Sequence, residues 1–326
     1  MFHRLHVADV IAETPDAHSL VLSVPPALAD AFGYQPGQYL TVRVPDGNGG
    51  LARCYSLSSS PHTDTDLKIT VKRVRDGQAS NWICDHVRPG ATLELMPPAG
   101  EFTPTSLDDD LLLLAGGSGI TPVMGIIKSV LAHGQGRLTL LYANRDAGSV
   151  IFATELADLT ARHQDRLTVI HWLDDTRGAP RDDSLGELLR PYADREAFVC
   201  GPDPFVVVAR RALQYAGVLE ERVHVERFDS VVVVTADATA EVRLDGQTHE
   251  LHWPAGTRLL DLLIEAGLNP PFSCRQGNCG TCATRLTAGK VEMLHNEVLE
   301  EEDFAEGYIL ACQAVARSER IVVDYD

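Results

Sequence analysis

The stretch "PFSCRQGNCGTCATRL", residues 271–286, places three cysteines within nine residues. Cys274, Cys279 and Cys282 follow the spacing C-x4-C-x2-C. The next cysteine, Cys312, comes after 29 intervening residues, in "YILACQAVA". Three thiols in one short loop with a fourth farther along indicate four ligands for one metal centre.

This spacing is that of plant-type [2Fe-2S] sites. One tight loop supplies three thiolates and a distant strand end supplies the fourth, while Gly277 and Gly280 let backbone amides approach the cluster sulfides. Zinc is the weaker alternative, because structural zinc sites normally combine two separated cysteine pairs. Disulfides are disfavoured by the odd count of seven cysteines and a reducing compartment. Cys54 and Cys84 are expected to be small buried hydrophobes.

The composition indicates a globular chain of several domains. With 326 residues the chain is long enough for two or three domains, and 44% of its residues are apolar, without low-complexity tracts. The N-terminus lacks a basic region followed by an apolar one, and no run of about 18 apolar residues occurs. These features predict a soluble cytoplasmic protein.

The charge is strongly and unevenly acidic. A net charge of −18 argues against nucleic acid and anionic membranes as partners. The last 97 residues contain 16 acidic and 7 basic side chains, which is half of the net charge. The segment "EVLEEEDFAEG", 297–307, lies between the third and fourth cysteines. It predicts either a docking surface for a basic partner or a solvated helix face.

The pattern of apolar residues changes twice along the chain. Up to about residue 104, apolar and polar residues alternate between glycines and prolines, which predicts a small antiparallel barrel. From about residue 111, buried strands alternate with helical segments, among them an expected helix at 149–163 and an expected strand at 167–173, which predicts a parallel sheet with crossover helices. Alternation resumes after about residue 240. We therefore expect three domains, at 1–104, 105–228 and 229–326.

Three motifs of the first domain suit a flat, phosphorylated ligand. "RCYSLSSSP", 53–61, presents a cation, an aromatic ring and a hydroxyl. "DGQASNWI", 76–83, opens a helix whose free amides can bind a pyrophosphate, and "MPPAGEF", 96–102, ends the barrel. The order R-x-Y-S, G-x-x-S, P-x-G-x-F resembles the flavin domain of the ferredoxin-NADP reductase superfamily.

The resemblance implies specific flavin contacts. Tyr55 would pack on the flavin ring, Ser56 would lie near its reactive N5, and Arg53 with Ser80 would bind the phosphates. Further flavin-contacting residues on the same grounds are Leu57, Val71, Lys72, Val74, Gly77, Gln78 and Ala79. The pair "GQASNW" and "PPAGEF" is more similar to the FAD-binding branch than to the phthalate-type branch that binds FMN, so FAD is expected and FMN is the alternative.

The second domain opens with "LLLLAGGSGITPVMGII", 111–127, a buried strand leading into glycines and a helix start. Glycines there let the backbone approach a dinucleotide pyrophosphate above the helix N-terminus. The stretch lacks the G-x-G-x-x-G spacing but resembles the G-G-x-G-I-T-P motif of the same superfamily, as do "YANR", 142–145, and "VCGPDPF", 199–205. The implied nucleotide-binding residues are Gly116, Gly117, Gly119, Thr121, Pro122, Asn144, Arg145, Cys200, Gly201 and Pro202.

The reacting groups follow from this resemblance. Cys200 would lie beside the nicotinamide, and Glu226 with Phe228, in "VHVERF", would cover the flavin and its proton route. Together with Ser56 these are the predicted catalytic residues. Arg145 suits a 2′-phosphate, but Asp146 would repel it and "YANRD" has no second clustered cation, so NADH is favoured over NADPH.

The order of flavin, nicotinamide and ferredoxin domains resembles the reductase components of multicomponent bacterial oxygenases, over essentially the whole chain. The implied activity passes electrons from NADH through a flavin and a [2Fe-2S] cluster to an external oxygenase that docks on the acidic ferredoxin domain. A monomeric reductase is expected. The alternative is a stand-alone oxidoreductase that reduces a small acceptor or another electron carrier. A pure carrier module would lack the nucleotide motifs.

Overall fold

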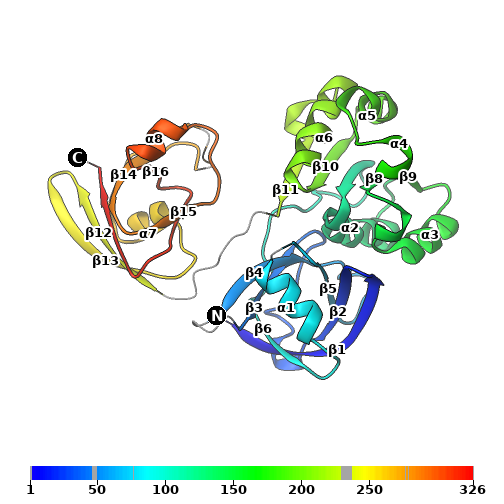
Figure 1. Cartoon of the computed structure of the whole chain (residues 1–326), viewed down its shortest axis with the longest axis horizontal. Coiled ribbons are helices and arrows are strands. Elements are labelled where there is room, and N and C mark those ends of the chain that lie inside the picture. Colours follow the sequence, from blue (N-terminus) through cyan, green and yellow to red (C-terminus); the bar gives the residue numbers. More distant parts are fainter. Residues whose placement is uncertain are drawn as a thin grey trace. The chain divides into compact units, whose positions relative to one another are not determined.

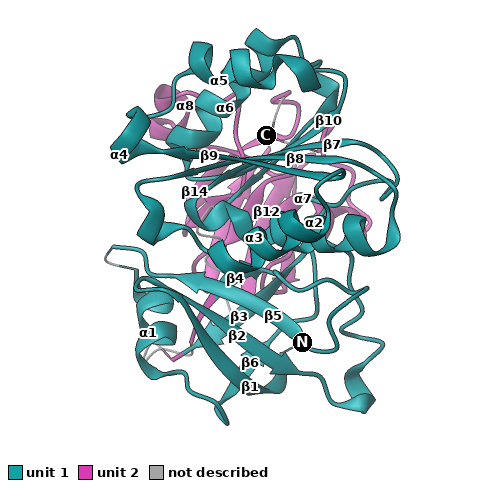
Figure 2. Ribbon diagram, turned by 90° about the vertical axis from the view of Figure 1, so that its right-hand side faces the viewer, with its two compact units in different colours: residues 1–44, 53–230 teal, residues 45–52, 231–326 magenta. Residues whose placement is uncertain are grey.

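The computed structural model describes residues 2–45, 50–75, 77–228, 237–275, 277 and 279–325. The chain forms two compact units, one of residues 1–44 and 53–230 and the other of residues 45–52 and 231–326 (Figure 2). The first unit contains an antiparallel and a parallel sheet, and the second contains a mixed sheet and a two-stranded sheet (Figure 1).

The antiparallel sheet has the strand order β4-β3-β6-β1-β2-β5. Leu57, just after β4, forms an antiparallel bridge with Ile69 in β5. Because these strands stand at opposite ends of the order, the bridge closes the sheet into the predicted barrel. Its elements are β1 (His3–Thr14), β2 (Ala17–Ser23), η1 (Pro26–Leu28), β3 (Tyr39–Val44), β4 (Leu51–Ser56), β5 (Leu67–Lys72), α1 (Gln78–His86) and β6 (Thr92–Leu95).

Strand β1 was not predicted from the sequence, although it is the longest strand described. Its register with β2 shifts between Val7 and Asp9 and again between Ala12 and Thr14. Each shift moves the following side chains to the opposite face, so the strand has no continuous alternation of apolar and polar residues. A two-residue periodicity therefore could not reveal it.

The parallel sheet has the order β11-β10-β7-β8-β9, with helices as crossovers, as predicted. Strand β7 is central and every one of its residues is buried, which explains its uninterrupted apolar sequence. The elements are β7 (Leu111–Gly116), η2 (Gly117–Gly119), α2 (Ile120–His133), β8 (Leu138–Asn144), η3 (Ala147–Ser149), α3 (Ala153–Arg162), β9 (Leu167–Leu173), α4 (Asp174–Arg177), α5 (Asp182–Leu189), η4 (Arg190–Tyr192), β10 (Glu196–Gly201), α6 (Asp203–Ala216), η5 (Glu220–Arg222) and β11 (Val223–Arg227).

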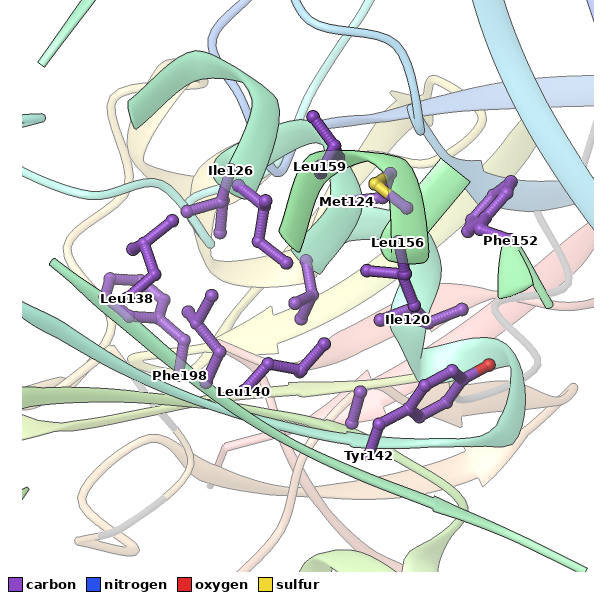
Figure 3. Packing of buried hydrophobic residues seen from close by; sticks show 14 of the residues in the cluster. Ile120, Met124, Ile126, Leu138, Leu140, Tyr142, Phe152, Leu156, Leu159 and Phe198 are labelled. Carbon is purple, nitrogen blue, oxygen red and sulfur yellow. The ribbon is translucent and has the colours of Figure 1, made fainter. Parts of the chain in front are cut away.

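One face of this sheet packs on α2 and α3 (Figure 3). Ile120, Met124 and Leu156 from the helices meet Leu140 and Phe198 from the strands, and all five are buried. This core fixes the end of β7, where the glycines lie.

Helix α3 begins later than the sequence predicted. Its pattern suggested a helix from residue 149, but Phe152 has φ 61°, a left-handed conformation that ends any preceding helical turn. Asp146 and Ser149 instead form a capping box around η3. The side chain of Phe152 is nonetheless buried, which explains why the apolar pattern extended too far.

Polar contacts join the barrel to the parallel sheet within the first unit. Lys128 of α2 is 8% exposed, and its Nζ lies 2.6 Å from Asp64 Oδ2 and 3.3 Å from Glu155 Oε1. A Cβ on Gly125, also in α2, would stand 2.9 Å from the backbone oxygen of Ser59. The close approach and the ion pairs of the buried Lys128 align the two halves of the unit.

The second unit has a five-stranded sheet of order β13-β12-β18-β14-β16 and a separate β15-β17 ladder. Strands β12 and β18 are parallel, and the remaining pairs are antiparallel. Trp253, Leu259 and Leu263 fill its core. The elements are β12 (Ala238–Leu244), β13 (Gln247–Trp253), α7 (Leu259–Glu265), β14 (Ala283–Ala288), β15 (Val291–Met293), α8 (Glu301–Ala305), β16 (Tyr308–Leu310), β17 (Ala314–Ala316) and β18 (Arg320–Asp324).

The expected boundary near residue 104 falls between β6 and β7, inside the first unit, and the one near 229 lies outside the described residues. The three domain limits therefore stay predictions. Among the helices of the described residues, none has the length and apolar character needed to cross a membrane.

Candidate functional site

Strand β4 presents the cation and the aromatic ring predicted for flavin binding. Arg53 and Tyr55 are two positions apart, so their side chains lie on the same face of the strand, and both are half-buried. Burial lowers the pKa of Arg53 and raises the pKa of Tyr55. Ser56 and Leu57 are buried in the barrel. A half-buried ring beside a cation suits a ligand that is both flat and anionic.

Three of the four predicted catalytic residues lie together. Strands β10 and β11 pair in parallel so that Cys200 is opposite Glu226. Ser56 Oγ, from the barrel, donates a hydrogen bond of 3.3 Å to Glu226 Oε2. Cys200 is fully buried, and burial together with the Glu226 carboxylate raises the pKa of its thiol. Phe228, which follows β11, is 43% exposed.

Glu226 has a pKa well above that of an ordinary glutamate. Burial raises its pKa to about 8, and the hydrogen bond from Ser56 opposes this shift. An unfolded glutamate has a pKa of about 4.3. The folded protein therefore binds more protons between these values, and stability falls as pH rises from about 5 to about 8.

We expect Glu226→Gln to reduce this dependence, because glutamine does not titrate. The change in Tm between about pH 5.5 and about pH 8 should be smaller in the variant than in the parent, as measured by scanning calorimetry. Glu101→Gln, at an exposed carboxylate of the same unit, is the control. Equal slopes for Glu226→Gln and the parent would contradict the assignment.

Helix α1 begins where the sequence predicted a phosphate-binding turn. Gly77 is its N-cap in extended conformation, and Gln78, Ala79 and Ser80 form the first turn. Ser80 Oγ accepts a hydrogen bond of 3.2 Å from the backbone N–H of Val74. A Cβ on Gly77 would lie 2.8 Å from that oxygen, so a larger residue would displace the serine. The free amides of the first turn remain suited to a phosphate.

The other predicted flavin residues differ in their exposure. Val71 is fully buried in the barrel, so only its backbone can face a ligand. Val74 is 60% exposed. Lys72 ends β5, and its Nζ lies 3.2 Å from the position of a Cβ on Gly117. Lys72 therefore connects the barrel with the glycine turn of the parallel sheet.

The glycines after β7 have two different roles. A Cβ on Gly116 would lie 2.7 Å from the ring of Phe205, and one on Gly119 would lie 2.0 Å from the backbone oxygen of Cys200. These two glycines thus permit packing inside the protein. Gly117 has φ 52°, and a Cβ added to it would lie 3.2 Å from Lys72 Nζ. The role of all three glycines in ligand approach stays a prediction.

The residues after the glycines stabilise the turn. Thr121 Oγ1 donates to the backbone oxygen of Ser118 at 3.0 Å, and Pro122 lies in the first turn of α2. Tyr142 is fully buried, and its Oη donates to the backbone oxygen of Gly117 at 3.0 Å. Tyr142 is therefore a packing residue beneath the glycine turn.

Two polar residues end strand β8. Asn144 is 6% exposed, and its side chain interacts with the hydroxyl of Tyr142. Such a buried amide fits a ligand with ribose or amide groups. Arg145 is exposed, and its Nη2 lies 3.4 Å from Asp16 Oδ2.

Gly201 and Pro202 follow Cys200 at the end of β10. A Cβ on Gly201 would lie 2.7 Å from the ring of Phe205, and Pro202 is the N-cap of α6. The turn thus keeps the backbone beside Cys200 close to the glycines that follow β7.

The four predicted cluster cysteines form two pairs in the second unit. Cys279 is exposed and hydrogen-bonds to Thr281 and to Cys274, which lowers the pKa of its thiol. Cys282 and Cys312 are 2% exposed and hydrogen-bond to each other, while burial raises the pKa of Cys282. Among the described residues, no three His, Cys, Asp or Glu side chains lie close enough together to bind one metal ion.

Two glycines of the cysteine segment have backbone conformations that residues with a Cβ rarely adopt. Gly277 has φ 85° and Gly280 has φ 71°, and a Cβ on Gly277 would lie 2.8 Å from the backbone oxygen of His295. Gln313 was not predicted. Its Nε2 donates to the backbone oxygen of Arg275 at 3.0 Å and to Cys312 Sγ at 3.8 Å, joining the two cysteine-bearing segments. The donor set and this loop fit a [2Fe-2S] cluster.

Comparison with known proteins identifies each part of the chain. Residues 4–103 match the oxidoreductase FAD-binding domain, residues 113–211 the oxidoreductase NAD-binding domain, and residues 242–317 the 2Fe-2S iron-sulfur cluster binding domain. The ferredoxin reductase component of 3-ketosteroid-9-alpha-monooxygenase from Mycolicibacterium smegmatis is 51% identical, over 99% of this chain and 97% of that protein. The chain belongs to this ferredoxin reductase component family.

Further relatives show how broad the reductase family is. One subunit of the 1,2-phenylacetyl-CoA epoxidase from Escherichia coli is 35% identical, over 100% of this chain and 98% of that protein. The solved structure of phthalate dioxygenase reductase, a modular protein for electron transfer from pyridine nucleotides to [2Fe-2S], covers 99% of this chain and 98% of its own, with 28% identity and a TM-score of 0.65. The predicted family, fold class and set of FAD, NAD and 2Fe-2S domains are confirmed.

Proposed function

We propose that this reductase takes electrons from NADH and delivers them singly to an oxygenase partner. The contact that carries this proposal joins Ser56 of the barrel to Glu226, opposite Cys200 in the parallel sheet. It brings the predicted flavin edge and the predicted nicotinamide pocket to one place. Bound FAD would accept two electrons as a hydride and release them one at a time to the [2Fe-2S] cluster.

The chain's own residues bind and orient the two ligands in this proposal. Tyr55 packs on the flavin ring, and Arg53 with the first turn of α1 binds its phosphates. The nicotinamide lies between Ser56 and Cys200. The partly buried carboxyl of Glu226, with its raised pKa, retains a proton at Oε2 or Oε1 near neutral pH and supplies a proton route.

The nucleotide extends from this pocket across the glycine turn. Gly117 lies against the pyrophosphate beside Lys72, and the buried Asn144 amide hydrogen-bonds to the ligand. Arg145 lies at the adenosine end. NADH remains the proposed electron donor. Because NADH is kept available in the cytoplasm, we propose that the reductase works there. We also propose that it is a monomer.

Electrons leave through the second unit, where Cys274, Cys279, Cys282 and Cys312 are the proposed cluster ligands. Helix α8 lies between the third and fourth of these cysteines in the sequence, and Glu301 and Glu302 on it are exposed. We propose that this acidic helix contributes to docking of a basic surface of the oxygenase. Such attraction accelerates association and weakens with salt.

The docking proposal is tested with the double variant Glu301→Gln and Glu302→Gln. These two side chains lie outside the Glu300–Asp303 capping box, so α8 should keep its N-terminus. We expect NADH-driven turnover of the purified oxygenase to fall about threefold to tenfold at low salt, with a weaker dependence on salt. Reduction of ferricyanide should change little, because this small acceptor takes electrons from the flavin.

The matched control is Asp158→Asn with Asp165→Asn, two exposed acids of the first unit. Equal losses in both double variants would mean that only the overall charge matters, and the acidic helix would not be the docking site. Full NADH turnover with a small acceptor but no electron transfer to any oxygenase would favour the stand-alone oxidoreductase instead.

A further inference from the structure

Arg145 occupies a position that governs nucleotide choice. It is the first residue after β8, which lies next to the central strand β7. In dinucleotide-binding sheets, side chains after this strand reach the 2′ position of the adenosine ribose, where an arginine accommodates the 2′-phosphate of NADPH. By this rule Arg145 alone would favour NADPH, against the proposed use of NADH.

The structure places a carboxylate from the barrel against this arginine. Asp16 lies in the turn between β1 and β2, and its Oδ2 is 3.4 Å from Arg145 Nη2. The turn is fixed by its backbone: Asp16 N donates to Thr14 Oγ1 at 3.3 Å, and Arg73 N donates to Asp16 O at 2.7 Å. These bonds hold the backbone from which the Asp16 carboxylate reaches Arg145.

The neighbouring acid, Asp146, is engaged elsewhere. Its Oδ1 accepts a hydrogen bond of 2.9 Å from the backbone N–H of Ser149, within the capping box of η3. The sequence had suggested Asp146 as the group that repels a 2′-phosphate. The geometry points instead to Asp16, which lies 129 positions from Arg145 in the sequence.

A second cation lies in the same region. Burial and, next, the charge of Arg145 lower the pKa of Lys72, while Asp16 and then Asp146 oppose this shift. Lys72 and Arg145 are thus close enough to repel each other, and Asp16 offsets both charges. Without Asp16, the two cations would form a site attractive to a dianionic phosphate.

We propose that Asp16 determines the preference for NADH by neutralising Arg145 and repelling the 2′-phosphate of NADPH. This inference rests on the proposed use of NADH and adds the residue that enforces it. The negative charge of Asp16 repels a 2′-phosphate that approaches Arg145, whereas the neutral 2′-hydroxyl of NADH is not repelled. Discrimination of this kind depends on a repulsive element as much as on an attractive one.

The test compares Asp16→Asn with the parent, using ferricyanide as acceptor so that the cluster is not involved. We expect the ratio of kcat/KM for NADPH to that for NADH to rise about tenfold or more, mainly through a lower KM for NADPH. Inhibition by adenosine 2′-phosphate should strengthen by a similar factor, while inhibition by adenosine 5′-phosphate should change less. A purely structural role for the ion pair would not separate these two inhibitors.

Adding Arg145→Ala to Asp16→Asn should cancel the gain, because the phosphate then loses its cation. Asp146→Asn should raise the ratio less than Asp16→Asn does, and Asp158→Asn should leave it at the parental value. The inference is overturned if the parent prefers NADH but Asp16→Asn leaves the ratio unchanged, or if the gain survives removal of Arg145. A parent that prefers NADPH would overturn the proposed electron donor as well. The kcat/KM ratio of the parent tests that donor separately from the variants.

Discussion

Cys279→Ser is expected to abolish electron delivery to protein acceptors while leaving NADH oxidation at the flavin intact. Cys279 is the exposed member of the cysteine loop, and it lies in the second unit. Ser56, Cys200 and Glu226 all lie in the first unit. Loss of one thiolate ligand disrupts the proposed cluster without touching the hydride-transfer site.

The measurement compares two acceptors. Reduction of cytochrome c or of the oxygenase should fall on the order of 100-fold or more, because the one-electron exit is lost. Ferricyanide reduction with NADH should stay near the parental rate. Cys84→Ser, at a buried cysteine of the barrel, controls for loss of a thiol as such. If Cys279→Ser retains its flavin but loses both activities together, or keeps both, the proposed electron route is wrong.

Gly119→Ala is expected to impair nicotinamide binding strongly, although alanine normally suits its backbone conformation. Gly119 has φ −61°, so no strain arises from the dihedral angles. The added Cβ would instead lie 2.0 Å from the backbone oxygen of Cys200 and 2.7 Å from the nitrogen of Gly201. Relieving this overlap must move the turn that shapes the proposed nicotinamide pocket.

A displacement of about 1 Å at a reacting centre can cost about 100-fold in rate. We therefore expect kcat/KM for NADH with ferricyanide to fall by about this factor. Overpacking should also destabilise the fold by about 1–3 kcal/mol, which is measured as a lower Tm. The flavin spectrum should persist, since the flavin residues lie mainly in the barrel. Near-parental kinetics would show that the strand ends can shift freely.

Gly178→Ala is the matched control for this variant. Gly178 has φ 72°, which strains any residue with a Cβ, but no heavy atom lies within 4 Å of the added carbon. Its substitution should lower stability modestly and leave the kinetics unchanged. The contrast separates steric overlap at the nucleotide turn from a general effect of replacing glycine.

Much of the fold follows from local patterns in this sequence. Strand β7 is apolar at nearly every position because helices cover both faces of a parallel sheet, and β9 was predicted at 167–173 as observed. Strand β1 and the start of α3 were not, because bulges in the first and the left-handed Phe152 in the second interrupt the periodicity on which such predictions depend.

The candidate site divides in the same way. The cysteine spacing, the glycine turn and the R-x-Y-S tetrapeptide are short-range patterns that name the ligands, so the sequence alone determined the family and its cofactor domains. Contacts between residues far apart in the chain depended on packing. These include Ser56 with Glu226 and Asp16 with Arg145. These contacts form because the barrel and the parallel sheet pack together at α2. No periodicity or motif in the sequence predicts contacts between residues so far apart. The tertiary structure therefore decided which side chain lies beside Gly117, which carboxyl has a pKa raised by burial, and which acid pairs with Arg145.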